Sequence, residues 1–207
     1  MTISDAIRLC RESSLSGWAL VEYAQGIVSS NMTYSYSNSL DSPEEAFEKG
    51  KGYCWHQASA LNTILQALGI QSQLVHAFRN LIPASVFEEV SIPEHVSGHM
   101  WCRVTIDGDE KDVCPGYKDN RPGVIHFQPL SPVKKWNRAI AFFSYWGSAM
   151  VNAQRLRKIN MKKKKIKEKW NPDTCPCKKK EKCPRYKICD ECKQHHYSHN
   201  SLPYCER

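Results

Sequence analysis

Apolar residues recur at helical spacing over the first 30 residues of the chain. Ile3, Ile7 and Cys10 share one helix face, and a second helical run begins at Ser16. The following residues, 31–40, are rich in Ser, Asn and Tyr and show no apolar periodicity. The pattern therefore predicts two helices followed by a loop.

Two more helices are expected before residue 70. Asp41 or Ser42 can cap a helix that Pro43 begins and that Gly50 keeps short. A longer amphipathic helix is indicated by apolar residues at spacings of 4, 3, 4 and 3, namely Cys54, Ala58, Leu61, Leu65 and Leu68. Gly69 ends this second helix.

The pattern then changes to strands. Residues 70–79 read as a strand, and residues 80–97, which contain two prolines, as a long loop. Residues 99–106 alternate as a strand, and Asp107-Gly108 is a tight-turn sequence that returns the chain as residues 110–114. The pattern therefore predicts a strand hairpin after the helices.

The last part of the chain is predicted to contain a short strand near residues 124–127 and a long helix over residues 134–170. The helix begins with aromatic residues and ends in a lysine run. With 41% hydrophobic residues the chain can bury a core, so a wholly disordered protein is excluded. No apolar run reaches the roughly 18 residues that cross a bilayer, and no signal-peptide pattern opens the chain, so we expect a cytoplasmic protein without a membrane partner.

Charge and cysteine content both change abruptly toward the end of the chain. Residues 155–207 contain 17 Lys and Arg against 6 Asp and Glu, a net charge of +11, whereas the rest carries −3. Six of the ten cysteines lie in the last 33 residues. These changes predict a core over residues 1–133, an aromatic-then-basic helix over 134–170 and a cysteine-rich module over 171–207.

Cys54 is the candidate nucleophile. It follows Gly52 and opens a helix, where the positive end of the dipole favours a thiolate and the residue's own N–H can bind an oxyanion. The alternative is that Cys54 is a small buried hydrophobic residue at the start of the core stripe. The sequence does not identify a second oxyanion donor.

A base for Cys54 has to come from another element. His56 is rotated roughly 200° around the helix from Cys54, and His76 lies in an apolar strand, as a core histidine does. His99 follows Gly98 and opens a strand at the mouth of a long loop, where rigid scaffolds present reactive groups. We therefore predict His99 as the base.

Asp112 is the candidate for the group that orients the imidazole. A two-residue turn at 107–108 pairs Arg103 with Asp112 and places His99 opposite Gly116. Asp112 is then a cross-strand salt partner of Arg103, too far along the strand to reach His99. A bulge or a longer loop would bring the two together.

At these residues the chain resembles the transglutaminase-like superfamily. The resemblance rests on Gly52-Tyr-Cys54-Trp55, on the helix that leads to Leu68-Gly69-Ile70, and on Gly98-His99-Met-Trp101 ahead of a strand–Asp–Gly–strand hairpin, and it covers about residues 30–133. It implies an α+β fold with a papain-type core, in which a Cys-bearing helix packs on an antiparallel sheet, with Cys54 as nucleophile, His99 as base and an acid on the next strand.

One departure from the family concerns the acid. Many members place the acid immediately before a proline, and this chain has Cys114 before Pro115. The third residue is thus Asp112, or there is no carboxylate in that place.

Cys54 and His99 together indicate a cysteine acyl-transfer enzyme that works through a thioester, and hydrolysis of an amide or peptide bond is the nearer interpretation. The alternatives are an N-acyltransferase, in which an amine resolves a carrier-bound thioester or a glutamine-derived acyl group, and a non-catalytic module that binds a partner or nucleic acid.

The cysteine-rich module is predicted to bind zinc structurally, because it has too few aliphatic residues to fold on hydrophobic burial. The candidate ligands are Cys175, Cys177, Cys183, Cys189, Cys192, His196 and Cys205. A disulfide knot or an iron–sulfur cluster are the alternatives. The segment from Lys162 to Lys169 can dock an acidic carrier or partner protein, or form a solvated helix face. Nucleic acid is less favoured, because no aromatic residues interleave with the lysines.

Overall fold

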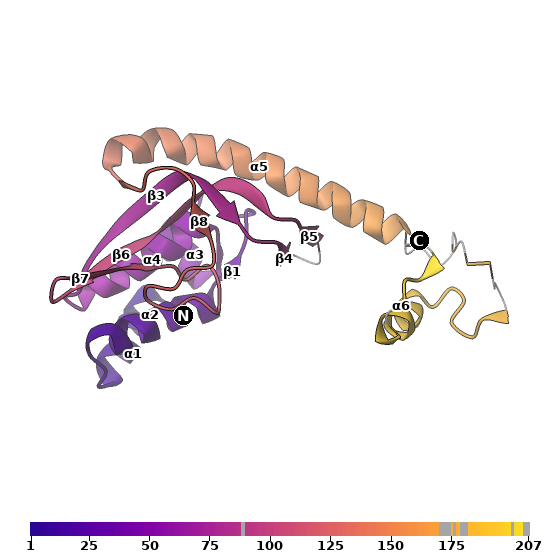
Figure 1. The fold of residues 1–207 in the computed structure, drawn as a ribbon, viewed down its shortest axis with the longest axis horizontal. Helices are drawn as coiled ribbons and strands as arrows, with labels where there is room; N and C mark the ends of the chain where they lie inside the picture. Colours follow the sequence, from indigo (N-terminus) through magenta and orange to yellow (C-terminus); the bar gives the residue numbers. More distant parts are fainter. Residues whose placement is uncertain (88–89, 170–174, 176, 179–181, 200, 205–207) are drawn as a thin grey trace. The chain divides into compact units, whose positions relative to one another are not determined.

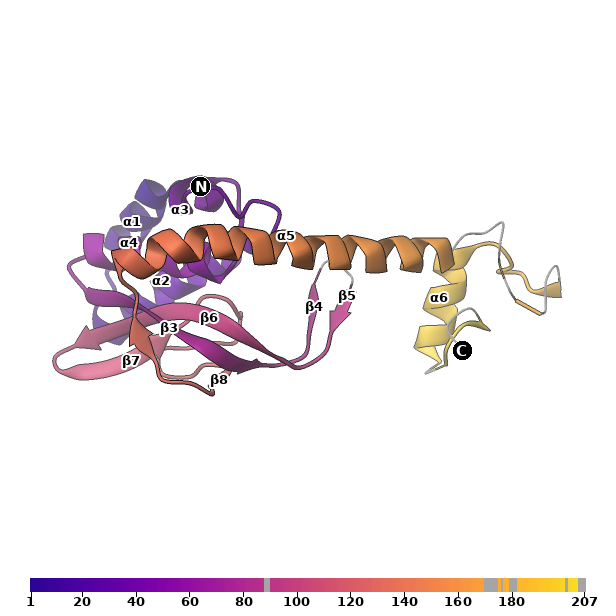
Figure 2. The ribbon, with the colours of Figure 1, turned by 90° about the horizontal axis from the view of Figure 1, so that it is seen from above.

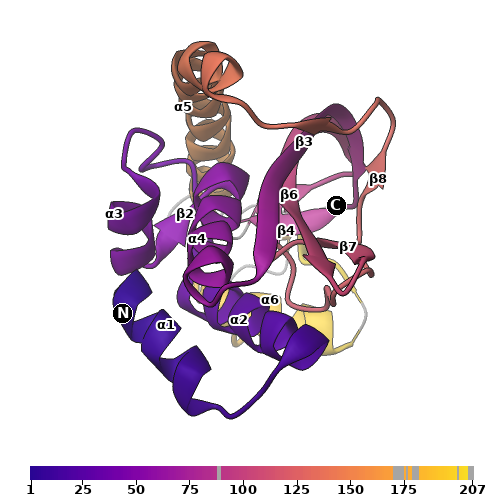
Figure 3. The ribbon, with the colours of Figure 1, turned by 90° about the vertical axis from the view of Figure 1, so that its left-hand side faces the viewer.

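The architecture is that of a computed structural model, which describes all residues except 88–89, 170–174, 176, 179–181, 200 and 205–207 (Figure 1). Contacts within the chain divide it into two units, Met1–Leu156 and Arg157–Arg207. The first unit is an α+β fold with helices on one side and an antiparallel sheet on the other (Figure 3).

The predicted helices of the first unit are present. α1 (Ile3–Glu12) begins with a capping box between Thr2 and Asp5, and α2 (Gly17–Asn31) follows it. α3 (Pro43–Glu48) begins with a second capping box, formed by Ser42 and Glu45. The segment expected as a loop also contains a short strand, β1 (Thr33–Tyr34), which pairs in parallel with β2 (Lys51–Gly52).

Helix α4 (Cys54–Ala67) lies at the centre of the first unit. It contacts α1, α2 and α3 on one side and the sheet on the other (Figure 3). Its core positions include Ala58, Leu61 and Leu65, which are fully buried and come from the apolar stripe seen in the sequence. Burial of that stripe fixes the start of the helix, and with it the position of Cys54.

The sheet is built on two long strands, β3 (Gln71–Ile82) and β6 (His95–Ile106). β7 (Asp109–Val113) pairs with β6, while β8 (Gln128–Pro129) and β9 (Lys134–Lys135) pair with β3, all of them antiparallel. The turn residues Asp107 and Gly108 both have positive φ, at 50° and 83°, as a two-residue hairpin turn requires. The register expected from that turn is confirmed.

Two strand boundaries differ from the predictions. Residues 80–97 are not one long loop: β3 and β6 continue to pair beyond an irregularity between Ala77 and Asn80, and β4 (Ser85–Phe87) and β5 (Val90–Ile92) form a hairpin between them. The ladder of β3 and β6 thus extends to Ile82 and His95, and the segment between the two prolines forms a separate two-stranded sheet. The strand expected near 124–127 is replaced by an isolated bridge and by β8.

The core of the first unit lies on both faces of the sheet. Met100, Cys102 and Val104 point toward α4, whereas Trp101 points to the opposite face and packs with Phe127 and Cys114. This alternation places His99 on the same face of β6 as Trp101.

The long helix α5 (Arg138–Lys169) confirms the predicted helical segment, although it starts after β9 and Trp136. Its first part, up to residue 156, belongs to the first unit and lies over the β3 side of the sheet (Figures 1 and 2). The aromatic side chains expected between residues 138 and 145 are outside the described part. No helix in the described part of the chain is long and apolar enough to cross a membrane.

The second unit contains the rest of α5 and one more helix, α6 (Cys189–Ser198). Lys162 and Lys164 are exposed on α5, Lys163 is partly buried, and the side chains of residues 165–169 lie outside the described part. Whether this basic segment docks a partner remains a prediction.

Candidate active site

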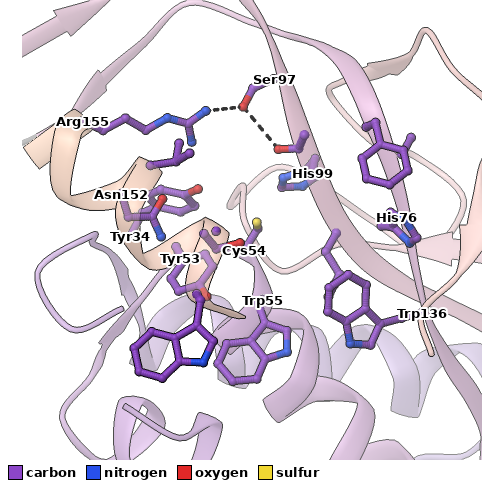
Figure 4. Close-up of a pocket in the computed structure, with 18 residues that line it drawn as sticks. Tyr34, Tyr53, Cys54, Trp55, His76, Ser97, His99, Trp136, Asn152 and Arg155 are labelled. Carbon is purple, nitrogen blue, oxygen red and sulfur yellow. Dashed lines mark hydrogen bonds between the residues drawn. The ribbon is translucent and has the colours of Figure 1, made fainter. Parts of the chain in front are cut away.

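A cavity of about 930 Å³ opens in the first unit, between the start of α4, strands β3 and β6, and α5 (Figure 4). Aromatic side chains supply most of its apolar wall: Tyr34, Tyr53, Trp55, Phe78, Trp136 and Trp146. Both Cys54 and His99 line it. The two residues that the sequence pairs as nucleophile and base therefore meet in one pocket.

Cys54 owes its position to a tight approach between β2 and α4. A Cβ atom on Gly52 would lie 2.6 Å from Cβ of His56 and 2.8 Å from Cε of Met32, so only glycine fits there. Tyr53, the N-cap residue, is extended and makes no side-chain cap, which leaves the first N–H groups of α4 without a cap from that side chain. Gly52 is needed for packing rather than for the approach of a substrate.

The pKa of the Cys54 thiol is raised, chiefly by burial. A hydrogen bond with the backbone of Met100, the charge of Arg155 and a hydrogen bond with the side chain of Tyr34 act in the opposite direction. The helix start alone predicted a bias toward thiolate, but desolvation outweighs it. In the free protein Cys54 is thus a neutral thiol near pH 7.

His99 is held by two aromatic rings. Its imidazole stacks on Trp101, with ring centroids 6.2 Å apart at 20°, and meets the ring of Phe127 edge-on at 4.4 Å. Burial lowers the pKa of His99 to about 4, so the ring is neutral near pH 7 and can accept a proton. In Figure 4 the sulfur of Cys54 points toward the side of the pocket where this ring lies.

Cys114 contacts the imidazole of His99 at Nε2. Its Sγ lies 3.3 Å from Nε2 of His99 and accepts the N–H of Gly116 at 3.4 Å. Burial raises the pKa of Cys114 to about 12, so the group is a neutral thiol. Cys114 precedes Pro115, where the family resemblance implies an acid, and the sequence analysis gave this residue no role.

The backbone around Cys114 is fixed by buried amides. Gln25 of α2 and Asn120 both donate to the Cys114 carbonyl, at 3.2 and 2.9 Å. A Cβ on Gly116 would lie 3.9 Å from Cε1 of His99, which matches the predicted register of His99 opposite Gly116. These contacts fix the segment against the imidazole.

The structure does not bring Asp112 to His99. Its carboxylate receives two hydrogen bonds from Arg103, at 2.9 and 3.3 Å, directly across the β6–β7 ladder. This is the salt partnership that the two-residue turn predicts, and no bulge interrupts the ladder at this point. Asp112 therefore forms the expected cross-strand ion pair with Arg103, and Cys114, not Asp112, contacts His99.

Two other histidines of this unit, His56 and His76, differ in their surroundings. His56 is fully buried on α4 and bonds the carbonyl of Asp41 at 3.0 Å, away from Cys54, as the helical rotation predicts. His76 was expected as a core histidine; it is 5% exposed but lines the pocket, edge-on to Phe78 and Trp136. Neither ring nitrogen of His76 has a hydrogen-bond partner among the described residues.

Two further pocket residues were missed from the sequence. Tyr34 is placed beside Cys54 because β1 pairs with β2, the strand immediately before α4. Arg155 reaches the pocket from α5 and donates to Oγ of Ser97 at 2.7 Å. Ser148, Asn152 and Arg155 lie at the spacing of one helix face. That spacing was the only sequence signal that Arg155 could reach a site.

The tail cysteines carry no assembled metal centre in the part of the second unit that the structure describes: no three His, Cys, Asp or Glu side chains there are grouped to hold an ion. α6 does place Cys189, Cys192 and His196 at the spacing of one helix face. The thiolate and imidazole donors suit zinc. Cys175, Cys177 and Cys183 are half-buried in the preceding segment, and Cys205 lies outside the described residues. Zinc binding remains a prediction.

Comparison with known proteins agrees with the resemblance seen in the sequence. Residues 12–111 match the transglutaminase-like superfamily. No curated protein matches the sequence. Among solved structures, one named "Putative Cysteine Protease from Cytophaga hutchinsonii" matches 65% of this chain at 11% identity with a TM-score of 0.40, and the chain spans about half (49%) of that structure's length. The family match supports a cysteine-dependent enzyme in general.

Proposed function

Starting from a chain whose residues 12–111 belong to the transglutaminase-like superfamily, we propose that the protein is a cysteine acyl-transfer enzyme that hydrolyses an amide or peptide bond through a thioester. The observation that carries the proposal is the convergence of Cys54 and His99 on one pocket. An intact pair of this kind favours an enzyme over a binding module.

The first step is attack by Cys54 on the carbonyl carbon of the bound amide. Nδ1 of neutral His99 accepts the thiol proton while Nε2 keeps its own proton toward the sulfur of Cys114. The oxyanion is bound by the N–H of Cys54 at the start of α4 and by the phenol of Tyr34, which we assign as the second donor. The His99 imidazolium then protonates the leaving amine, and a thioester remains on Cys54.

In the second step water attacks the thioester. His99 accepts a proton from the water molecule, the carbonyl re-forms, and the Cys54 sulfur leaves and takes the proton back. Because burial holds the pKa of His99 at about 4, the ring returns to its neutral form between the steps.

Aminolysis is the second candidate, and the apolar wall of the pocket favours it. An amine in place of water would yield a new amide, with every other step unchanged. Six aromatic residues line the space in front of Cys54 and limit the access of water to a thioester there.

The test is acylation of Cys54 by an activated ester, followed by mass spectrometry of the intact chain and of its peptides. We expect one acyl group per chain on Cys54, none on Cys54→Ala, and accumulation of the acyl-enzyme in His99→Gln if water is the acceptor. Addition of an amine distinguishes the two acceptors by its product. Equal labelling of wild type and Cys54→Ala contradicts the proposal.

A further inference from the structure

Arg155 gives the pocket a single fixed charge. Among the described lining residues it is the only one that is ionised near pH 7, because burial lowers the pKa of both His76 and His99 and raises that of Cys54. The lining includes no Asp or Glu. The pocket is therefore apolar and electropositive at once.

The hydrogen-bond partners of the guanidinium are neutral. One NH2 group donates to Oγ of Ser97 at 2.7 Å and the other to the hydroxyl of Tyr36 at 3.4 Å, and the guanidinium lies over the Tyr36 ring at 5.5 Å. Arg155 takes part in none of the ion pairs formed by the described residues. A guanidinium has five donors, so these two bonds leave capacity for an anion.

These contacts hold the charge in place. Ser97 lies two residues before His99 on β6, so the bond to Arg155 ties the pocket face of α5 to the strand that carries the base (Figure 4). A half-buried cation without an anionic partner is poorly compensated beside an apolar wall. A carboxylate or phosphate that enters the pocket supplies that compensation through charge-assisted bonds.

We propose that Arg155 is the anion-binding subsite of this pocket and that the acyl substrate of Cys54 carries a carboxylate or phosphate group. The inference rests on the proposed function of Cys54. The charge of Arg155 acts on Cys54 itself, so the anionic group belongs to the part of the substrate near the bond that reacts. A carboxylate would come from the acyl side, and a phosphate from the leaving group of a thioester.

The first test measures binding without turnover. 4-Phenylbutyrate and its amide, which differ by one charge, are compared as protectants of Cys54 against iodoacetamide. We expect the carboxylate to protect wild type at about tenfold lower concentration, which corresponds to one charge-assisted contact of about 1.4 kcal/mol. In Arg155→Gln the two compounds should protect equally, and Arg155→Lys should recover part of the difference.

The second test uses substrates. kcat/KM is measured for the p-nitrophenyl esters of hexanoic acid and of adipic acid, the latter with a free carboxylate, and for hexanoyl thioesters of pantetheine and 4′-phosphopantetheine. Loss of Arg155 also changes the Cys54 thiol, which affects both members of a pair equally. The ratio of the two kcat/KM values within each pair therefore measures recognition of the anionic group alone. A preference for the adipate ester indicates a carboxylate on the acyl side, and a preference for the phosphopantetheine thioester indicates a phosphate on the leaving group.

Arg8→Gln is the matched control, because it removes one exposed positive charge on α1 outside the pocket. It should leave both ratios as in wild type. Equal protection of wild type by phenylbutyrate and its amide overturns the anion subsite, whatever the activity. Preferential protection by the carboxylate without acylation of Cys54 by any ester or thioester overturns the proposed function and leaves the subsite in place.

Discussion

Sγ of Cys114 lies 3.3 Å from Nε2 of His99, so a neutral thiol is the hydrogen-bond partner of the imidazole at that nitrogen. A thiol in this place accepts the Nε2 proton weakly and brings no negative charge. In the proposed mechanism the His99 imidazolium would lack the carboxylate that stabilises it in an acid-containing triad. The low pKa of His99 is the expected result of that combination of burial and neutrality.

Cys114→Asp should therefore raise the pKa of His99, because a carboxylate beside the ring favours its charged form. The imidazolium in turn favours the Cys54 thiolate, so alkylation of Cys54 should extend to lower pH. We expect about tenfold faster alkylation than in Cys114→Ser at pH 6, equivalent to a shift of about one pKa unit. The rate is measured with iodoacetamide between pH 5 and 9.

Cys102→Ser serves as the control for Cys114. Cys102 is also fully buried, on the neighbouring strand, and its Sγ donates to the carbonyl of Ala58 at 3.2 Å, a bond that serine can keep. Its pH profile should match wild type. A Cys114→Asp protein that folds but reacts as Cys114→Ser does would show that residue 114 does not act on His99.

The buried neutral state of His99 should also appear in the pH dependence of stability. Between the unfolded pKa of about 6.5 and the folded value of about 4, the unfolded chain binds a proton that the folded chain does not. The free energy of unfolding should therefore fall as the pH decreases through this window, by about 3 kcal/mol from this residue. Urea unfolding of wild type and His99→Gln at pH 7 and 4.5 measures the contribution of His99. If the free energy of unfolding falls equally in both proteins, His99 is not the buried neutral group that causes the fall.

Asp112→Asn separates a structural role from a catalytic one. The Arg103–Asp112 pair is about one quarter exposed on each side, so its loss should reduce the free energy of unfolding by about 1 kcal/mol or less. Acylation of Cys54 should stay within about twofold of wild type. A hundredfold slower reaction in a folded variant would restore Asp112 to the catalytic apparatus.

Gly52→Ala should destabilise the protein, because the new methyl group would overlap His56 and Met32. Overpacking of this kind costs about 1–3 kcal/mol and should displace Cys54 with the start of α4. Gly26→Ala on α2 is the control: nothing lies within 4 Å of its added Cβ, and the change should stabilise the helix by about 0.5–1 kcal/mol. Thermal unfolding of the two variants should thus move in opposite directions.

Metal analysis tests the cysteine-rich module. Full-length protein purified under reducing conditions should contain about one or two zinc ions per chain, with four ligands for each. Cys189→Ser and Cys192→Ser should lose metal, whereas Cys10→Ser, in the buried core of α1, should not. Metal-free protein with disulfides in the tail would contradict zinc binding and support a disulfide knot.

That Cys54 and His99 line one pocket could be predicted, because both residues are marked by local patterns. Cys54 begins an apolar stripe after Gly52, and His99 begins a strand whose hairpin partner is set by the turn at Asp107-Gly108. The same turn predicted the Arg103–Asp112 pair correctly, since a two-residue loop fixes the register of every pair that follows.

The residues that were missed depend on contacts between distant segments. Cys114 reaches His99 through a segment anchored by Gln25, and Arg155 reaches Ser97 in the pocket from α5, 58 residues further along the chain. Such contacts follow from tertiary packing, which periodicity does not encode. The error at residues 80–97 has a related cause, because strands at the far end of a ladder are stabilised by their partner rather than by their own sequence.

The charged residues of β7 affect whether copies of the chain associate through the edges of their sheets. β7 is the terminal strand of its sheet, and no described strand pairs with it on the side away from β6. An edge without a strand partner is a template for pairing with the edge of another copy, and charged side chains on it oppose aggregation. Gly123 covers part of this edge, because its N–H donates to the Asp112 carbonyl at 2.9 Å. Asp109, Glu110, Lys111 and Asp112 occupy four of the five positions of β7. Asp112, the candidate catalytic acid of the sequence, is thus one of the charged residues of an edge strand, and these charges oppose the joining of separate molecules into a continuous sheet.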